Sequence, residues 1–412
     1  MRIATKTLGC KVNQVETEAL AAALPLVAVD FPQAADVYLI NSCAVTGTAG
    51  AECRAVVRRA RRANPEAVIA VTGCYVELAR EELREAGAHI LVDNTHKAQL
   101  PILVAEHLGL ELSDYEAAET VWGNGEAPGE RIRAFLKVQD GCAAGCSYCI
   151  IWKLRGEERN RPIAAVVRAA EKLAAQGIKE IVLTGVHLGA FEPGLVVLLR
   201  ELLPIGPALR ISSLEPECIS PELLELMAQQ PRIRPHLHLP LQSGSDHILG
   251  KMRRRYQYRH FRARVRQAYE LVPGFSLSMD LIAGFPGETE EDHQATVRAV
   301  EESRPVKLHV FPFSPREGTD AALMPHQVPP PLRQQRTAEL IALGERIVQE
   351  HIADLVGNTT PFLVERVSDS TARGYTPGYL KVRGRGIAQP GQDRGLLVQG
   401  AEGNVITGAV LP

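Results

Sequence analysis

Three cysteines stand close together at Cys142, Cys146 and Cys149, in the spacing CxxxCxxC. A loop this short can bring three thiolates onto one iron–sulfur cluster, and thiolates are the usual protein ligands of such clusters. The fourth iron of a [4Fe–4S] cluster would then lack a protein ligand and stay open to a small molecule. A zinc site is the alternative, but structural zinc sites use four ligands, and no fourth Cys or His stands nearby in the sequence. The spacing therefore favours a cluster with one open iron.

A second set of cysteines is spread more widely, at Cys10, Cys43 and Cys74. Each comes just after a short apolar run that predicts a buried strand. The carboxyl ends of parallel strands meet at one edge of a sheet, where ligands bind. The alternative is three separate buried cysteines, which are common in protein cores. Because the same structural position recurs three times, the pattern favours a second cluster at that edge.

The remaining cysteines of the eight, Cys53 and Cys218, are assigned no chemistry. Cys53 falls at helical spacing with alanines and valines that form an apolar stripe, which predicts a place in a core. Cys218 has no partner at a spacing that indicates a site.

Cys10, Cys43 and Cys74 would come together only in a parallel α/β sheet. The alternation of apolar runs and helical patterns in this part of the chain predicts such a sheet. The expected strands are 3–8, 37–40, 68–72 and 90–92, and the expected helices are 16–24, 47–64 and 77–85. A Gly/Pro-rich stretch at 123–129 reads as a linker. The fold class predicted here is α/β, with a doubly wound N-terminal domain over residues 1–122.

The CxxxCxxC loop follows the first strand of a second alternating region. Six β/α units predict a partial (β/α)6 barrel over residues 130–328. Its expected strands are 134–138, 180–184, 209–212, 236–240, 276–282 and 307–313, with helices at 164–176 and 290–302. Three prolines at 329–331 close this region, and a connecting helix is expected over about 332–355. Short runs at 362–367, 380–382, 396–398 and 405–410 then predict a small β-barrel over 356–412.

Composition says more about the cellular compartment of the protein than about its function. The 412 residues carry a formal net charge of −2 and a pI near 6.7, so bulk charge neither requires nor excludes a nucleic-acid partner. Neither a secretory signal nor a membrane-spanning apolar stretch is visible. Eight cysteines in a chain of this length are too sparse for a disulfide framework, so we expect a reducing, cytoplasmic setting and no membrane.

The CxxxCxxC loop resembles the signature of the radical S-adenosylmethionine superfamily, whose fold is a partial β/α barrel. The resemblance implies that the open iron holds the methionyl part of S-adenosylmethionine. It places Thr184, Gly185 and Val186 beside the methionyl group, and Gly284 and Pro286 beside the adenine. Glycines at strand ends allow a ligand to approach the backbone, although an ordinary strand-to-helix turn explains each motif equally well.

The whole chain is similar to the radical S-adenosylmethionine methylthiotransferases. The resemblance is carried by residues 7–14, 41–46, 72–75, 238–245 and 311–319, in addition to the CxxxCxxC loop. It implies two [4Fe–4S] clusters, a radical cluster on Cys142, Cys146 and Cys149 and an auxiliary one on Cys10, Cys43 and Cys74. The C-terminal barrel resembles a TRAM domain, a module associated with RNA binding.

Within this family the run Leu-Gly-Cys-Lys-Val-Asn at 8–13 and the run at 183–187 are most similar to the threonylcarbamoyladenosine branch. That branch adds a methylthio group to C2 of N6-threonylcarbamoyladenosine beside the tRNA anticodon. Unlike most of the family, the chain has Ile-Ile-Trp-Lys-Leu after Cys149, without a proline. A low-potential electron donor such as flavodoxin or ferredoxin is implied, and the oligomeric state is left open.

RNA binding needs cations and stacking surfaces. From 251 to 266 the chain has eight Lys/Arg and no acid, interleaved with aromatic residues. We expect RNA contacts from Arg254, Arg255 and Arg259 of this run and from Lys381 of the barrel, although a solvated helix face is the usual fate of such charges. Glu215 and Gln242, at barrel strand ends, are candidates to orient S-adenosylmethionine or substrate.

Three other functions compete with the tRNA assignment. Methylthiolation of a ribosomal protein side chain and of isopentenyladenosine in tRNA use the same chemistry on another substrate. A zinc-bound, non-enzymatic RNA-binding protein is the alternative from another class. C2 of an adenine is an unactivated carbon, so forming a C–S bond there requires a cofactor rather than acid–base groups.

Overall fold

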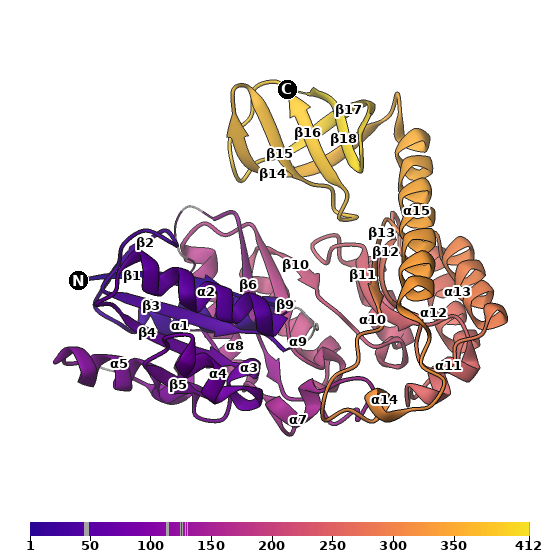
Figure 1. Cartoon of the computed structure of the whole chain (residues 1–412). Coiled ribbons are helices and arrows are strands. Elements are labelled where there is room, and N and C mark those ends of the chain that lie inside the picture. The colour runs from indigo at the N-terminus through magenta and orange to yellow at the C-terminus, as the bar shows by residue number, and fades with distance from the viewer. Residues whose placement is uncertain are drawn as a thin grey trace.

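The structure is a computed structural model that describes residues 1–44, 49–112, 115–123, 125, 127, 129 and 131–411 (Figure 1). Parts of several expectations therefore lie outside the described residues. They include the end of the 41–46 motif, the start of the helix expected at 47, positions 124, 126 and 128 of the linker, residue 130 at the expected start of the barrel domain and residue 412 at the end of the small β-barrel.

The N-terminal part is a five-stranded parallel sheet in the order β2-β1-β3-β4-β5. Alternate residues of its strands enter two cores. One is closed by α2 and α4, the other by α1 and α5 on the opposite face, so the doubly wound prediction is confirmed. The strands are β1 Arg2–Thr7, β2 Val27–Val29, β3 Val37–Ser42, β4 Val68–Gly73 and β5 Ile90–Val92. The helices are α1 Lys11–Ala22, α2 Ala49–Ala63, α3 Cys74–Leu78, α4 Arg80–Glu85, α5 Leu100–Leu108 and the short α6 Ala117–Thr120.

The central part contains six parallel strands in two hydrogen-bonded groups, β10-β9-β6 and β11-β12-β13. Parallel bridges, Leu209 to Ile233 and Ser213 to His238, join the groups beside β10 and β11, which gives the expected partial barrel. The strands are β6 Arg133–Lys137, β9 Glu180–Thr184, β10 Ala208–Ile211, β11 His236–Gln242, β12 Ser276–Ala283 and β13 Lys307–Pro312. A two-stranded ribbon, β7 Gln139–Asp140 with β8 Arg159–Asn160, flanks the cysteine loop.

Helices cover the outer face of these strands and complete the largest core. They are α8 Ile163–Ala175, α9 Leu195–Leu202, α10 Pro221–Gln229, α12 Tyr258–Leu271 and α13 Glu290–Ser303, together with the shorter α7 Ile151–Arg155, α11 Asp246–Lys251 and α14 Asp320–Leu323. None of the helices in the described part of the chain is long and apolar enough to cross a membrane.

A long helix, α15 Pro330–Leu355, runs from the barrel strands to a closed five-stranded β-barrel in the order β14-β15-β16-β18-β17 (Figure 1). The strands are β14 Thr359–Ser368, β15 Thr371–Tyr375, β16 Lys381–Arg385, β17 Asp393–Glu402 and β18 Val405–Val410. The barrel has its own apolar core, to which the end of α15 contributes Val348 and Ile352.

Two helix boundaries differ from the prediction for identifiable reasons. α1 begins at Lys11 rather than residue 16, because Cys10 is its extended N-cap and the buried face already starts at Val12. α15 begins at Pro330, inside the triple proline, because a proline fits the first helical turn, where its missing N–H costs nothing.

Candidate functional site

The three N-terminal cysteines lie at one edge of the five-stranded sheet. β1, β3 and β4 are neighbours, with Thr7 opposite Asn41 and Ser42 opposite Gly73 in the pairing register. Cys10 caps α1, Cys43 follows β3 and Cys74 is the first residue of α3. The chain thus brings them together at the carboxyl ends of three adjacent strands. Their role as cluster ligands stays a prediction.

A glycine permits the close approach of two of these cysteines. Gly9 has φ +94°, and a Cβ atom built there would lie 2.7 Å from Cys43 Sγ. The thiol of Cys43 therefore packs directly against the backbone that leads into Cys10. Any other residue at position 9 would push the two ligand candidates apart.

The CxxxCxxC loop lies between β7 and α7. The Ala144 amide lies 3.4 Å from Cys142 Sγ, and the Cys149 amide donates to the Cys146 carbonyl at 3.1 Å. Burial, together with the neighbouring Cys146 and Cys142 thiols, raises the pKa of Cys149 to about 12. The free thiol therefore keeps its proton at neutral pH, and metal binding must release it. Three thiols in one short loop, with an amide directed at sulfur, fit a cluster better than an apolar core.

A histidine lies beside Cys142, contrary to the expectation that no further candidate ligand is near. His187 Nδ1 contacts Glu158 Oε1 at 2.7 Å, and Cys142, Glu158 and His187 hold their ligand atoms within 4.8 Å of one another. The sequence distance hid this residue, because it comes from the turn after β9. The group contains only one of the three cysteines, so it does not form a Cys3His zinc site among the described residues.

The segment that follows the second cysteine set packs against the first set across the interface between the sheet and the barrel. Cys74 and Ala44 form a small apolar cluster with Ile150 and Leu154, which belong to the segment directly after Cys149. The Asn94 amide group lies 3.4 Å from Cys74 Sγ and donates to the Leu154 carbonyl at 3.1 Å. One side chain thereby contacts a candidate ligand of the first set and the segment that follows the second.

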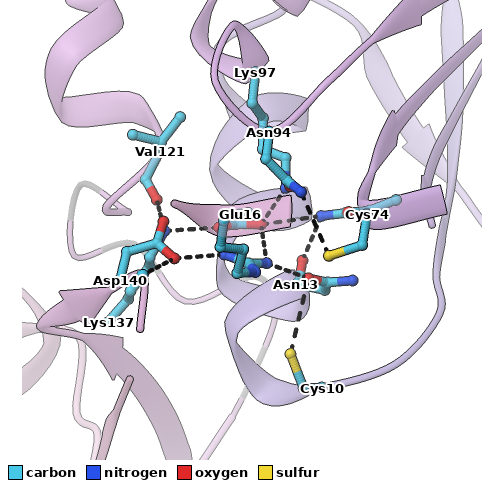
Figure 2. A network of polar contacts seen from close by, with 12 residues as sticks. Cys10, Asn13, Glu16, Cys74, Asn94, Lys97, Val121, Lys137 and Asp140 are labelled. Carbon is cyan, nitrogen blue, oxygen red and sulfur yellow. Dashed lines mark hydrogen bonds and ion pairs between the residues drawn. The ribbon is translucent and has the colours of Figure 1, made fainter. Parts of the chain in front are cut away.

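A buried carboxylate, Glu16 of α1, joins the two parts (Figure 2). Its oxygens lie 2.5 Å from Lys97 Nζ, 2.7 Å from Lys137 Nζ and 2.9 Å from Arg155 Nη1. Burial opposes the ionisation of Glu16, but the charges of Arg155, Lys137 and Lys97 hold its pKa well below the usual range. Lys137 and Arg155 flank the cysteine loop, so this pairing fixes that loop against the sheet.

Asp140 and Asn13 extend the network to the cysteines themselves. Asp140, two residues before Cys142, pairs with Arg155 at 2.7 Å. The other guanidinium nitrogen of Arg155 donates to Asn13 Oδ1 at 2.6 Å. Asn13 Oδ1 also lies 3.8 Å from Cys10 Sγ. The network, drawn in Figure 2, therefore links Cys10 to Asp140, a residue just before the second cysteine set. Sequence reasoning missed its charged members because a charge gives no local sign of burial.

The residues expected beside the methionyl group lie at the end of β9. Thr184 is buried as the last residue of that strand. A Cβ atom at Gly185 would lie 2.9 Å from Gln139 Oε1, and the same oxygen accepts from the His187 amide at 2.7 Å. Gln139 therefore holds the turn that contains Gly185 and Val186 close to the strand that leads into the cysteine loop.

The other expected cofactor residues lie at the carboxyl ends of the next strands. Gln242 ends β11 with φ 68°, a strained conformation for a residue other than glycine, of the kind found at functional sites. Gly284 follows β12, also with positive φ, and its amide donates to Glu288 Oε1 at 2.9 Å. Pro286 is buried in the same turn. Contact of these residues with S-adenosylmethionine stays a prediction.

Arg254 requires a correction. The side chain, expected on an RNA-binding surface, is only 5% exposed and pairs with Glu215 at 3.5 Å. Its Nη1 lies 3.4 Å from Cys146 Sγ. The half-buried carboxylate of Glu215 and the Cys146 sulfur atom therefore draw it inward, beside the cysteine loop. Arg255 and Arg259 are exposed, and their contact with RNA stays a prediction.

The C-terminal barrel presents a basic face that contains the expected Lys381 together with arginines that the sequence analysis did not single out. Arg366 lies opposite Arg373, and Arg373 opposite Arg383, on three neighbouring strands. Lys381 lines the same shallow hollow of about 260 Å³ as these arginines. Like charges directly across a strand pair are unfavourable by themselves. Glu402 pairs with Arg383 and offsets part of this repulsion.

Two family models match the chain. Residues 136–300 match the radical SAM superfamily, and residues 2–93 match an uncharacterized protein family, UPF0004. Among solved structures, the radical S-adenosylmethionine methyltransferase TsrM from Kitasatospora setae superimposes with a TM-score of 0.57. At 16% identity, over 92% of this chain and 81% of that one, it shows the fold alone.

Curated relatives match nearly the whole chain. The threonylcarbamoyladenosine tRNA methylthiotransferase MtaB of Bacillus subtilis is 36% identical over 92% of this chain and 89% of its own. The protein of the same name from Aquifex aeolicus is 33% identical over 95% of this chain and 98% of its own. A tRNA-2-methylthio-N(6)-dimethylallyladenosine synthase from Chlorobium limicola is 32% identical, covering 98% and 96%. The chain therefore belongs to the radical S-adenosylmethionine methylthiotransferase family, enzymes that transfer a methylthio group with S-adenosylmethionine and [4Fe–4S] chemistry.

Proposed function

We propose that the enzyme adds a methylthio group to C2 of N6-threonylcarbamoyladenosine in tRNA. The observation that carries this proposal is the 36% identity, over 92% of the chain, to a relative named for that substrate. The dimethylallyladenosine synthases match at similar identity and give the second candidate substrate. The Lys-Val-Asn run after Cys10 resembles the first group and favours it.

Two clusters divide the work in this proposal. Cys142, Cys146 and Cys149 hold the radical cluster, whose open iron takes S-adenosylmethionine. The auxiliary cluster, on the other three cysteines, supplies or presents sulfur. Support comes from the packing of Cys74 against the segment that follows Cys149, through a small apolar cluster and the Asn94 amide.

This chain's own residues would bind and orient the reactants. Thr184, Gly185, Val186, Gly284 and Pro286 would line the S-adenosylmethionine site, together with Glu215 and Gln242. Arg255, Arg259 and Lys381 would contact RNA phosphates, and the electron donor would be a flavodoxin or a ferredoxin.

The test offers the anaerobically reconstituted enzyme three matched tRNAs, carrying threonylcarbamoyladenosine, isopentenyladenosine or unmodified adenosine. With reductant and S-adenosylmethionine present, nucleosides are read by mass spectrometry. A methylthio mass gain confined to the threonylcarbamoyl nucleoside is expected. A mass gain on the isopentenyl nucleoside alone would make isopentenyladenosine the substrate instead. Cleavage of S-adenosylmethionine without a mass gain on any tRNA would point to a protein substrate.

Measurements of iron and acid-labile sulfide test whether the two cysteine sets hold separate clusters. Changing Cys10, Cys43 and Cys74 together to Ala should remove about half of the bound iron and abolish methylthiolation, while cleavage of S-adenosylmethionine continues. Changing Cys53 to Ala is the matched control, because this thiol is fully buried in the apolar core between β3 and α2. Equal iron in the triple variant and in the control would disprove the auxiliary site.

A further inference from the structure

The inner face of the partial barrel is polar. On β11, Leu237, Leu239 and Leu241 enter the core beneath the helices, so His236 and His238 face the opposite way. Closed barrels of this type fill their interior with branched apolar side chains. A polar interior is therefore suited to holding a polar ligand.

The edge strand β13 presents three side chains of different chemistry to this inner face. Leu308 and Val310 pack outward against the core, and a Cβ atom at Gly344 of α15 would lie 2.9 Å from Leu308 Cβ. Successive residues of a strand point to opposite faces. The inward side chains are therefore a cation, an imidazole and an aromatic ring in a row, at Lys307, His309 and Phe311.

Phe311 lies at the carboxyl end of this row, on the side of the cysteine loop. It pairs in register with Ile282 of β12. Ile282 and Tyr148, which stands between Cys146 and Cys149, pack against the same apolar cluster. Phe311 is nevertheless 43% exposed, and within the described residues no other ring and no cation stacks on it. An uncovered aromatic face on this side is a surface on which a nucleobase can stack.

His309, two residues earlier, is held by a carboxylate. Asp280 Oδ1 lies 2.9 Å from His309 Nδ1, and Asp280 Oδ2 lies 2.8 Å from His238 Nε2. Burial opposes the ionisation of Asp280, but hydrogen bonds from the two imidazoles hold its pKa well below the usual range. An ionised carboxylate only accepts, so both of these nitrogens carry a hydrogen. The other ring nitrogen of His309, Nε2, has no partner among the described residues, and the side chain is 36% exposed.

Lys307 supplies positive charge at the amino end of the row. Its ammonium group lies 5.6 Å from the centroid of the Tyr379 ring and forms no ion pair within the described part of the chain. His238, Asp280 and His309 hold their ligand atoms within 4.8 Å of one another, as a metal site would. An unpaired ammonium group on the same face, about 7 Å along the strand, disfavours a divalent cation. The row therefore favours a ligand with anionic or hydroxyl oxygens.

We propose that His309 is a specificity-determining residue that hydrogen-bonds the polar end of the threonylcarbamoyl group, while the adenine stacks on Phe311. This inference rests on the function proposed above. The reacting C2 and the substituted C6 are different corners of the adenine ring, so C2 can face the cysteine loop while the substituent extends along β13. The substituent ends in a hydroxyl and a carboxylate, which suit His309 Nε2 and the ammonium group of Lys307. A dimethylallyl group would leave both groups without a partner.

The experiment is a cycle of two enzymes and two substrates. Wild type and His309→Leu, both as reconstituted holoenzyme, are titrated with anticodon stem-loops that carry threonylcarbamoyladenosine or unmodified adenosine at the same position. Fluorescence anisotropy gives the dissociation constants. Wild type should bind the threonylcarbamoyl stem-loop about 10- to 100-fold more tightly than the unmodified one. His309→Leu should lose most of this preference, because only the threonylcarbamoyl stem-loop is weakened.

Phe311→Ala tests the stacking part of the proposal. It should weaken both stem-loops by a similar factor, about 5- to 100-fold, because the adenine ring is common to both. His107→Leu, a change at an exposed histidine of α5, is the matched control for both variants and should bind both stem-loops as wild type does.

Other outcomes contradict the proposal in recognisable ways. If His309→Leu weakens the two stem-loops equally, His309 supports the structure or contacts the shared RNA, and the proposal is overturned. Equal affinity of wild type for the two stem-loops overturns it without any variant. Bound zinc that disappears in His309→Leu would make the group a metal site instead.

Failure of the proposed function looks different. In that case wild type would methylthiolate a stem-loop that carries isopentenyladenosine and not the threonylcarbamoyl one. If wild type methylthiolates the threonylcarbamoyl stem-loop but binds it no better than the unmodified one, the proposed function stands and only this inference fails.

Discussion

At the scale of single residues, the enzyme depends on charges that are paired where water cannot reach them. Glu16, Lys97 and Lys137 are at most 2% exposed. A buried ion set is strongly destabilised when one partner is removed, because the others keep an uncompensated charge. Removing one charged partner should therefore lower the free energy of unfolding more for a buried carboxylate than for an exposed one.

Replacing Glu16 by Gln should destabilise the protein by about 3–5 kcal/mol, because three cations lose their common acid. Glu18→Gln is the control on the same helix, since Glu18 pairs with Arg131 near the surface, where such pairs contribute about 0–1 kcal/mol. Urea unfolding of the reduced apoprotein measures both. Equal losses in the two variants would contradict the role given to Glu16.

Glu180 makes stability depend on pH. Burial opposes its ionisation, but Arg210, Arg234 and Arg133 lower its pKa to about 2, from an ordinary value of 4.5. A depressed folded pKa stabilises the native state above pH 4.5, and the contribution is lost as the pH falls from 4.5 toward 2. Its full value is about 3 kcal/mol.

The difference in unfolding free energy between wild type and Glu180→Gln should therefore be largest at neutral pH and shrink below pH 4.5. Denaturant titrations from neutral to acidic pH provide the measurement. Glu225→Gln, which changes an exposed acid on α10, should show no such trend. A constant difference across the range would mean that Glu180 does not act through its charge.

At the scale of secondary-structure elements, strand ends and the turns after them position the chemistry. β1, β3 and β4 each deliver one cysteine, and the turn at Gly9 allows two of them to meet. Positive φ at Gly9 and the 2.7 Å approach of Cys43 Sγ act together, so an added methyl group is both strained and blocked.

Gly9→Ala should lose the iron that depends on Cys10, Cys43 and Cys74 while keeping the iron of the CxxxCxxC loop. Gly109→Ala is the matched control, because Gly109 also has positive φ but no atom lies within 4 Å of the added methyl group. Gly109→Ala should lower the stability of the protein by about 1 kcal/mol and should keep all of its iron. Iron and sulfide analysis of both variants decides, and unchanged iron in Gly9→Ala would refute the geometry.

The sequence predicted these elements where one residue pattern dominates. β5, β9 and β18 have the expected bounds, because their apolar runs end at turn residues. β15 was missed, because the run Thr-Ala-Arg-Gly-Tyr has no clear alternation and becomes a strand by pairing with β14 and β16. The cysteine positions followed from parallel topology. The inward turn of Arg254 did not, because its partners Glu215 and Cys146 are distant in sequence.

At the scale of the whole molecule, one aromatic loop attaches the C-terminal barrel to the partial barrel. The ring of Tyr379 lies 4.8 Å from that of His236, and the guanidinium of Arg210 stands 4.7 Å over it. The neighbouring backbone contributes as well, since the Gly378 carbonyl accepts from Ser276 Oγ at 2.7 Å. The small barrel is thus held at the amino ends of the strands, opposite the cysteine loop.

Tyr379→Ala should loosen this attachment by about 1–3 kcal/mol, from the ring and cation–π contacts that it removes. Small-angle scattering should report a larger radius of gyration, and tRNA binding should weaken while cleavage of S-adenosylmethionine is retained. Ile387→Ala, a change at a side chain that is 91% exposed on the same barrel, is the control. An unchanged scattering profile in Tyr379→Ala would show that other contacts, such as α15 and the Arg133–Glu365 ion pair at 3.1 Å, hold the barrel without this ring.

The carboxylate of Glu16 and the cations Lys137 and Arg155 come from opposite sides of the interface between sheet and barrel. This has a consequence for inheritance. A chimera that joins the sheet of one relative to the barrel of another should lose stability unless the acid and both cations are all present. An exchange of one part during evolution therefore favours keeping the buried charges on the two sides of the junction matched to each other.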